Sequence, residues 1–209
     1  MKKNKFYVLK SKPDYIFCPS YLPGTLNHEE WEWSLHETNP LKIEINKNYI
    51  FTVTDPDLNK IDFDLYGSDN AFVSQNFLEV CIKMNVKFRA PPLQMALDNG
   101  EKNKKKYFVF LPAEHVNLMD IEKSEFTEEI DLESKSVMIN KNFPPNPIYR
   151  QINRLIPDQK LTPHLFRCIE IMELVCTNDF LEAAQVAELK CLEFIPIDEN
   201  YKYDPWAGW

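Results

Sequence analysis

Glycine is scarce in this chain, and its spacing limits which sites the fold can build. The 209 residues include four glycines, Gly24, Gly67, Gly100 and Gly208, and the closest pair, Gly67 and Gly100, is 33 positions apart. Phosphate-binding loops and the nucleophile turn of many hydrolases need two or three glycines within about six residues. The motifs G-x-G-x-x-G, G-x-x-x-x-G-K and G-x-S-x-G are therefore excluded.

The charge balance favours a basic partner. The chain carries 32 acidic and 24 basic side chains, for a net charge of −8. Nucleic-acid binding needs clustered Lys and Arg, so we expect no nucleic-acid partner. The amino-terminal segment MKKNKFYVLK has too short an apolar run for a secretion signal, and no apolar run approaches the ~18 residues of a membrane span. We therefore expect a cytoplasmic protein without a membrane partner.

The five cysteines support the same compartment. Their number is odd, and no pair has the C-x-x-C spacing of a zinc or redox site. We expect reduced and mostly buried thiols, as is usual in a cytoplasm.

Short β-prone segments separated by prolines predict strands along most of the chain. The predicted strands cover residues 5–10, 41–45, 49–54, 61–66, 86–93, 107–111, 165–170, 174–176 and 190–197. Residues 148–156 fit either a strand or a helix, and we favour a strand because isoleucines alternate there. Helical spacing follows Ser74, a good N-cap, and a second helix is predicted over residues 178–188. Residues 142–147, with three prolines, predict a stiff extended linker. The sequence thus predicts an α+β fold of mostly antiparallel strands with two short amphipathic helices.

The two predicted helix starts resemble each other at an offset of 103 residues. Ser74-Gln75-Asn76-Phe77-Leu78-Glu79 aligns with Thr177-Asn178-Asp179-Phe180-Leu181-Glu182. Any capped helix that precedes a strand gives a similar pattern, so duplication and chance both remain open. We predict a single domain over residues 1–209, with two similar halves, 1–100 and 101–209, as the alternative organisation.

The carboxy-terminal pattern resembles a known family. A strand at residues 165–169, an apolar strand at 174–176, the capped helix 177–188 and the closing segment 192–197 together resemble immunity protein family eleven of bacterial polymorphic toxin systems. Residues 72–92 and 107–110 are similar to it as well, so the resemblance covers about residues 60–198. It implies a non-enzymatic cytoplasmic protein, with no cofactor or metal, that inactivates the catalytic domain of a toxin encoded by a neighbouring gene.

Enzyme chemistry is the main alternative. His28 and His36 lie among glutamates, but neither H-E-x-x-H nor H-x-H spacing is present. Asp62 and Asp64 form a D-x-D pattern, as in some metal-dependent hydrolases, although outward carboxylates on a half-buried strand explain it more simply. We therefore assign no catalytic or metal-binding residue.

The acidic segment 120–133 is the leading candidate binding surface. It holds seven acids and one lysine, with apolar residues between them. Acids around apolar anchors fit the basic cleft of a toxin, while a solvated loop is the simpler alternative. The expected contacts are Asp120, Glu122, Glu125, Phe126, Glu128, Glu129 and Asp131. A generic adaptor for another basic protein would use the same features.

Aromatic residues supply further candidate contacts. Trp31 and Trp33 lie in the segment HEEWEWSLHE, and Tyr203 and Trp206 lie in the last nine residues. Disordered tails rarely carry so many rings. The tail is therefore expected either to fold back onto the body, which we favour, or to dock into the partner.

Overall fold

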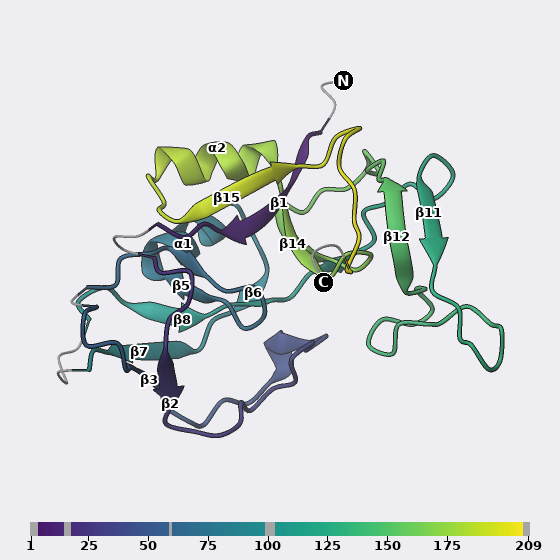
Figure 1. Ribbon diagram of the computed structural model, residues 1–209. Coiled ribbons are helices and arrows are strands. Elements are labelled where there is room, and N and C mark those ends of the chain that lie inside the picture. Colours follow the sequence, from purple (N-terminus) through teal and green to yellow (C-terminus); the bar gives the residue numbers. More distant parts are fainter. Residues whose placement is uncertain (1–3, 15–17, 59, 99–102, 207–209) are drawn as a thin grey trace.

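Two larger sheets, two small ribbons and two α-helices make up the fold (Figure 1). The computed structural model describes residues 4–14, 18–58, 60–98 and 103–206. One sheet has the order β2 (Gly24–Leu26), β3 (Tyr49–Val53), β7 (Pro92–Ala96), β8 (Tyr107–Val109), β5 (Phe72–Ser74) and β4 (Leu65–Tyr66). The other has the order β10 (His115–Val116), β13 (Leu165–Cys168), β14 (Glu173–Thr177), β1 (Phe6–Ser11) and β15 (Leu192–Pro196). The ribbons pair β6 (Phe88–Arg89) with β9 (Leu111–Pro112), and β11 (Glu125–Glu128) with β12 (Tyr149–Arg154).

Most strand pairs are antiparallel. Among the described strands, only the β3–β7 and β10–β13 pairs are parallel. The helices are α1 (Gln75–Lys83) and α2 (Asn178–Val186), nine residues each. The predicted α+β class, mainly antiparallel with two short helices, is therefore confirmed.

Both helices begin as their sequences predict. The hydroxyl of Ser74 accepts a hydrogen bond from the Phe77 amide at 3.1 Å, and that of Thr177 accepts one from the Phe180 amide at 3.4 Å. These bonds satisfy amides that lack partners in the first helical turn. Each helix is followed by a residue with positive φ, Asn85 at 54° and Glu188 at 53°, again 103 positions apart.

The first residue of each helix is hydrogen-bonded to the residue just before another strand. This strand completes a unit that occurs twice in the fold. The amide of Gln75 donates to the carbonyl of Lys106 before β8, and the amide of Asn178 donates to the carbonyl of Lys5 before β1. The segments that follow are similar in sequence, YFVF in residues 107–110 and FYVL in residues 6–9. Thus β1 has the same place beside β14 that β8 has beside β5, and the amino-terminal strand completes the carboxy-terminal sheet. A division at residue 100 does not separate the two sheets.

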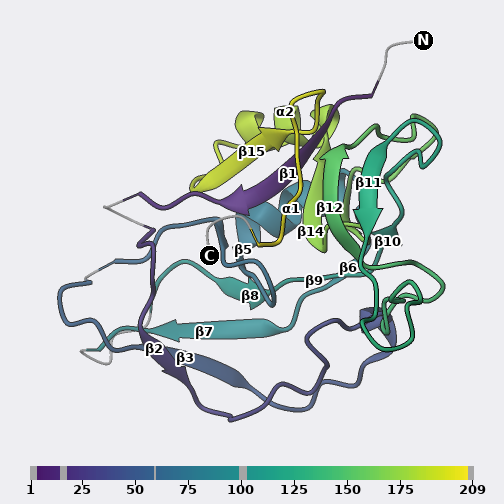
Figure 2. The same cartoon turned by 45° about the vertical axis from the view of Figure 1, so that its right-hand side comes forward.

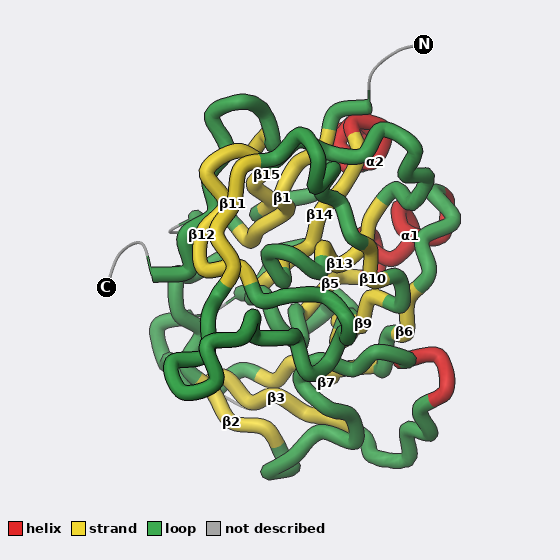
Figure 3. The backbone as a smooth tube through the Cα atoms, turned by 90° about the vertical axis from the view of Figure 1, so that its right-hand side faces the viewer, coloured by secondary structure: helices red, strands yellow, loops and turns green. Residues whose placement is uncertain are grey.

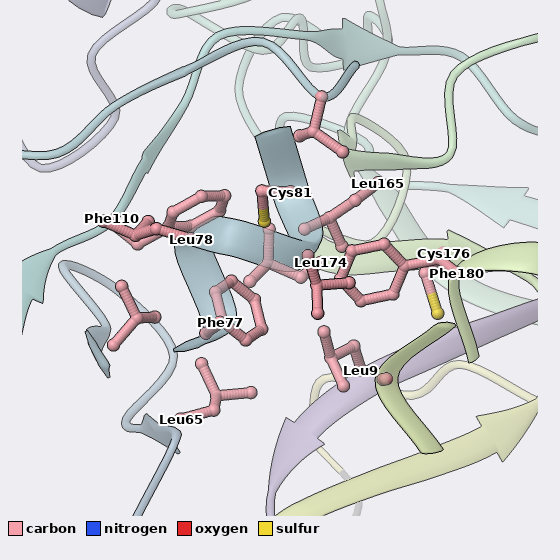
Figure 4. Close-up of a cluster of buried hydrophobic side chains, with 14 of the residues drawn as sticks. Leu9, Leu65, Phe77, Leu78, Cys81, Phe110, Leu165, Leu174, Cys176 and Phe180 are labelled. Atoms are coloured by element: carbon pink, nitrogen blue, oxygen red, sulfur yellow. The ribbon is translucent and has the colours of Figure 1, made fainter. Parts of the chain in front are cut away.

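The two units share one core. Phe77 and Phe180 start equivalent helices, and their rings meet edge to face with centroids 6.0 Å apart. Figure 4 shows both rings in one buried cluster, with side chains from β1, β4, β13 and β14 around them. Equivalent positions of both units enter this cluster: Leu9 with Phe110, Leu65 with Leu165, Val73 with Cys176, and Cys81 with Ala184.

Each sheet is covered on its other face by a different segment. Along β1, Leu9 belongs to the core cluster that the two units share, whereas Phe6 and Val8 belong to a separate buried cluster, which we call the third cluster. The side chains separate in this way because successive residues of a strand point to opposite faces. β12 contributes Tyr149 and Ile152 to this third cluster. The six-stranded sheet is covered by the loops that lie between β1 and β4. These loops contribute buried residues to a second cluster: Cys18, Leu22, Trp33, Ile61 and Phe63.

Some of the predicted elements are wrong. Residues 41–45 form no strand; a 3₁₀ helix spans Pro40–Lys42, and the amides of Asn46 and Lys47 donate to the Glu32 carboxylate instead of to a strand partner. Of residues 61–66, only Leu65–Tyr66 form a strand. The strand predicted at 86–93 is divided into β6 and β7 at residues 90–91, and Pro92 is the first residue of β7.

The segment 142–147 is a turn rather than an extended linker. The Phe143 amide donates to the Asn140 carbonyl at 3.3 Å, and the Asn146 amide donates to the Phe143 carbonyl at 3.0 Å. The chain reverses here, and Ile139 forms a β-bridge with Pro147. The segment therefore reverses the chain direction, which an extended linker would not do.

All five cysteines are free, and four of them are buried. In the described part of the chain, no helix has the length and apolar composition needed to cross a membrane.

Candidate functional site

A projecting arm carries the acidic segment. We call residues 120–148 the acidic arm; it leaves the body before β11 and returns at β12, on the right of Figure 1, and comes forward in Figure 2. Loop dominates this part of the chain in Figure 3, where β11 is paired with β12. Beyond the strands, the arm is held by bridges between Ile130 and Val137 and between Ile139 and Pro147. The arm is therefore an ordered projection and not a loose loop.

A buried carboxylate fixes the base of the arm. Glu170, 7% exposed, accepts hydrogen bonds from the amides of Leu118 at 3.1 Å and Met119 at 2.9 Å. The returning chain is joined to the same place, because the Asp158 amide donates to the Leu118 carbonyl at 2.7 Å. The sequence pattern gave no sign of this role for Glu170, since a lone glutamate after a strand is usually solvated.

Some of the predicted acidic contacts have partners within the arm or on β12. Asp120 is paired with Lys123, whose hydrogen bond lowers the pKa of the carboxyl. Glu125 pairs with Arg154 across the ribbon at 3.0 Å. Asp131 accepts hydrogen bonds from the amide and hydroxyl of Ser134, which lower its pKa and shape the turn at the tip.

The other three acids predicted as contacts have no side-chain partner in the described part of the chain. Glu122, Glu128 and Glu129 have no hydrogen bond or ion pair to a side chain of the described residues. The whole arm contains seven carboxylates and three lysines. Like charges on neighbouring exposed side chains repel, so this surface favours a basic partner.

Apolar side chains are also concentrated on the arm. Twelve large hydrophobic side chains are exposed in the described part of the chain, and six of them lie here: Ile121, Ile130, Leu132, Met138, Ile139 and Ile148. Leu132, at the tip, is 82% exposed. Clustered exposed apolar groups beside charges are typical of protein-binding surfaces.

Phe126 is a weaker contact than predicted. Its ring is half-buried and packs edge to face on Tyr149, with centroids 5.1 Å apart. It therefore anchors β11 to the third core cluster, and only part of it is open to a partner.

The two tryptophans named as candidate contacts differ in their exposure, and neither is fully exposed. Trp33 is buried, 7% exposed, and its indole N–H donates to Asn70 at 2.8 Å. Trp31 is half-buried and stacks on Trp33 with centroids 4.9 Å apart. Trp33 is thus a core residue of the six-stranded sheet, because its ring covers Tyr49 there.

The carboxy-terminal tail folds back, the outcome we favoured. Tyr203 and Ile152 of β12 exchange backbone hydrogen bonds at 2.8 and 2.9 Å, and both Tyr201 and Tyr203 pack on the third cluster. Tyr203 is half-buried, whereas Trp206 is 66% exposed. Of the two aromatic residues predicted as tail contacts, only Trp206 presents most of its ring.

The alternation of Asp62 and Asp64 with apolar residues predicts that both carboxylates point outward. This prediction is wrong. Asp64 is 2% exposed and Lys105 lies 2.7 Å from one of its oxygens, while Asp62 binds Lys105 at 3.1 Å and Lys190 at 2.8 Å. Partial burial alone would raise the pKa of Asp62, but the hydrogen bonds from Lys190 and Lys105 outweigh it and lower the pKa to about 2.

These lysines occupy the positions where a cation would bind the two carboxylates. The remaining oxygen contacts of Asp64 are structural, since it accepts from the Ser74 hydroxyl at 2.5 Å and from the Lys190 amide at 2.7 Å. In the described residues, no group of three or more His, Cys, Asp or Glu side chains is arranged to hold a metal ion.

The comparisons with known proteins return nothing that adds to this geometry: no family model matches the chain, and no curated protein matches it.

Proposed function

We propose that the chain is an immunity protein that binds the catalytic domain of a cognate bacterial toxin and blocks it in the cytoplasm of the producing cell. The single observation that carries the proposal is the acidic arm, an ordered projection with seven carboxylates and six exposed large apolar side chains. The resemblance of residues 60–198 to immunity protein family eleven supports the same function.

The arm suits inhibition by occupancy. Catalytic clefts that bind nucleic acids or nucleotides are basic, so an acidic projection is attracted to them, and exposed apolar groups supply affinity once the cleft is dry. Anchoring by Glu170 holds the arm in shape before binding, which lowers the entropy cost of association. No turnover is needed for this mechanism.

The hydrolase alternative has less support. Asp62 and Asp64 are both engaged by Lys105, and Asp64 is nearly inaccessible. A metal bound at this position would have to displace a lysine ammonium from two carboxylates, at a cost of several kcal/mol.

The test is complex formation with the product of the adjacent gene. We expect the catalytic domain of a toxin encoded there to form a one-to-one complex, measured by size-exclusion chromatography with light scattering. Replacing Glu122, Glu125, Glu128 and Glu129 by Gln should slow association about tenfold at low salt, because charge attraction speeds encounter. The matched control replaces four exposed acids elsewhere, Glu29, Glu30, Glu44 and Glu193, and should change the rate by less than about twofold.

A complex with an unrelated basic protein, and none with the neighbouring product, would favour the adaptor alternative. Turnover of a simple substrate would favour an enzyme.

A further inference from the structure

The edge of β11 is the part of the arm best suited to pair with another chain. In the ribbon, β12 lies between β11 and the tail, since Ile152 of β12 pairs with Tyr203 on its far side. No described strand pairs with the outer edge of β11. In Figures 1 and 2 this edge faces away from the body. The backbone groups of an edge strand can hydrogen-bond an added strand.

The charges on the ribbon are arranged across its width. The edge strand β11 begins and ends with glutamates, Glu125 and Glu128, and Glu129 follows directly. The bases lie on the inner strand, where Arg154 pairs with Glu125 at 3.0 Å. A strand added to the open edge therefore meets carboxylates first.

The same charges exclude a second copy of this chain as the occupant. Pairing of two β11 edges would bring the glutamates of one chain beside those of the other, and like charges directly opposite each other destabilise a sheet. A strand with Lys or Arg at alternate positions would instead gain cross-strand pairs of opposite charge.

Apolar groups flank the edge strand at both ends. Ile121 precedes β11 and is 62% exposed, while Ile130 and Leu132 follow it and are 41% and 82% exposed. Thr127, in the middle of the strand, is exposed and uncharged. An added strand would thus be held by backbone hydrogen bonds in the middle, and by apolar contacts where it enters and leaves.

We propose that β11 accepts an edge strand of a basic protein partner, so that the ribbon is extended by β-augmentation, with Lys or Arg side chains of the partner beside Glu125 and Glu129 on one face and beside Glu128 on the other. This inference rests on the proposed function, because the toxin's catalytic domain supplies the strand. It specifies more than charge attraction, since it requires hydrogen bonds to the β11 backbone.

Hydrogen exchange of the intact chain, alone and in complex with the neighbouring toxin's catalytic domain, tests the inference. We expect amides of residues 125–128 to exchange at least about tenfold more slowly in the complex, while amides of β2, the edge strand of the other sheet, keep their rates. A stable complex with unchanged exchange at 125–128 would overturn the inference and leave the proposed function standing. If no complex forms, the proposed function itself fails.

A pair of substitutions at one residue adds a second readout. The Glu129 amide donates to the Ile148 carbonyl, next to β12, and the Thr127 amide lies opposite Gln151 of β12, so the Glu128 amide between them faces the open edge. Glu128→Pro removes that amide, and Glu128→Gln removes the same charge but keeps the amide. We expect the dissociation rate of Glu128→Pro to be about tenfold or more above that of Glu128→Gln. Circular dichroism and melting temperature check that each variant folds. Equal dissociation rates of two folded variants would contradict strand addition, and the exchange experiment decides the case if Glu128→Pro does not fold.

Discussion

The two helix caps provide a matched pair of perturbations. The hydroxyl of Ser74 caps α1 and also donates to the buried Asp64 carboxylate, whereas that of Thr177 caps α2 and lies 3.0 Å from Nδ1 of His164. The two caps have the same position in equivalent units, but only one is bonded to a buried charge. Ser74→Ala should therefore destabilise the protein more than removal of the Thr177 hydroxyl.

The magnitudes follow from these contacts. Loss of a cap costs about 1 kcal/mol. A hydrogen bond to a charged group adds about 1.5 to 3 kcal/mol, whereas one to a neutral partner adds about 0.5 to 1.5 kcal/mol. We expect about 3 kcal/mol for Ser74→Ala and about 2 kcal/mol for loss of the Thr177 hydroxyl. Thr177 also carries a methyl group, so Thr177→Ser is the reference from which Thr177→Ala is measured.

Urea unfolding at pH 7, followed by tryptophan fluorescence, measures both free energies, because Trp33 is buried and becomes solvated on unfolding. Each variant must keep the m-value of the parent for the comparison to hold. Equal losses, or a larger loss at Thr177, would refute the assignment of a buried charged hydrogen bond to Ser74.

Three further predictions concern stability. The pKa of Asp62 in the folded protein is about 2, below its ordinary 3.8, so its ion pairs contribute about 1 to 2 kcal/mol to the free energy of unfolding above pH 3.8. This contribution is lost as the pH falls through about 2, and acid unfolding of Asp62→Asn should lack it. An acid transition that is the same in Asp62→Asn and the parent would contradict the prediction. Deletion of residues 199–209 should lower the melting temperature by about 5 to 10 °C, because Tyr201 and Tyr203 lose their packing on the third cluster; an unchanged melting temperature in differential scanning calorimetry would argue against the fold-back. Glu170→Ala should destabilise by about 2 to 4 kcal/mol, since two buried amides lose their acceptor, and should speed hydrogen exchange in the acidic arm more than in α1; uniform changes would show that Glu170 does not hold the arm.

Local signals in the sequence were sufficient for the helices and many strands. Ser74 and Thr177 are followed by apolar residues at helical spacing, so each helix start could be placed at its cap. Residues 107–111 form an apolar run, and β8 lies inside the six-stranded sheet as such a run predicts. These features depend on neighbours in the sequence.

Features that depend on distant residues could not be predicted. Asp64 is buried because Lys105 and Lys190 reach it from positions far along the chain, and alternation alone made it look solvated. β1 pairs with β14 and β15 near the other end of the chain. The repeat could be read from the two helix starts, but nothing near them in the sequence indicates that the amino-terminal strand joins the second unit. Residues 41–45 alternate like a strand, yet a 3₁₀ helix spans Pro40–Lys42, and the amides of Asn46 and Lys47 that follow the segment donate to the distant Glu32 side chain.

The candidate site was predicted in part. Charge density alone pointed to residues 120–133, and the apolar residues between the acids are indeed exposed, as at Ile121, Ile130 and Leu132. The sequence did not reveal that the segment belongs to an ordered arm, because its anchor Glu170 follows about 50 residues after the arm begins. Trp33 was misplaced because an aromatic residue among glutamates resembles a surface residue, while its partners Asn70 and Tyr49 lie elsewhere in the chain.

Survival of cells that express the neighbouring toxin domain is the most direct test of the account. Coexpression of the intact chain should restore growth, and the four-glutamate control at Glu29, Glu30, Glu44 and Glu193 should restore it equally. The variant with Gln at 122, 125, 128 and 129 should protect less at matched protein levels. Full toxicity in the presence of the intact chain, or equal protection by the arm variant and its control, would contradict the proposal that the acidic arm blocks a toxin.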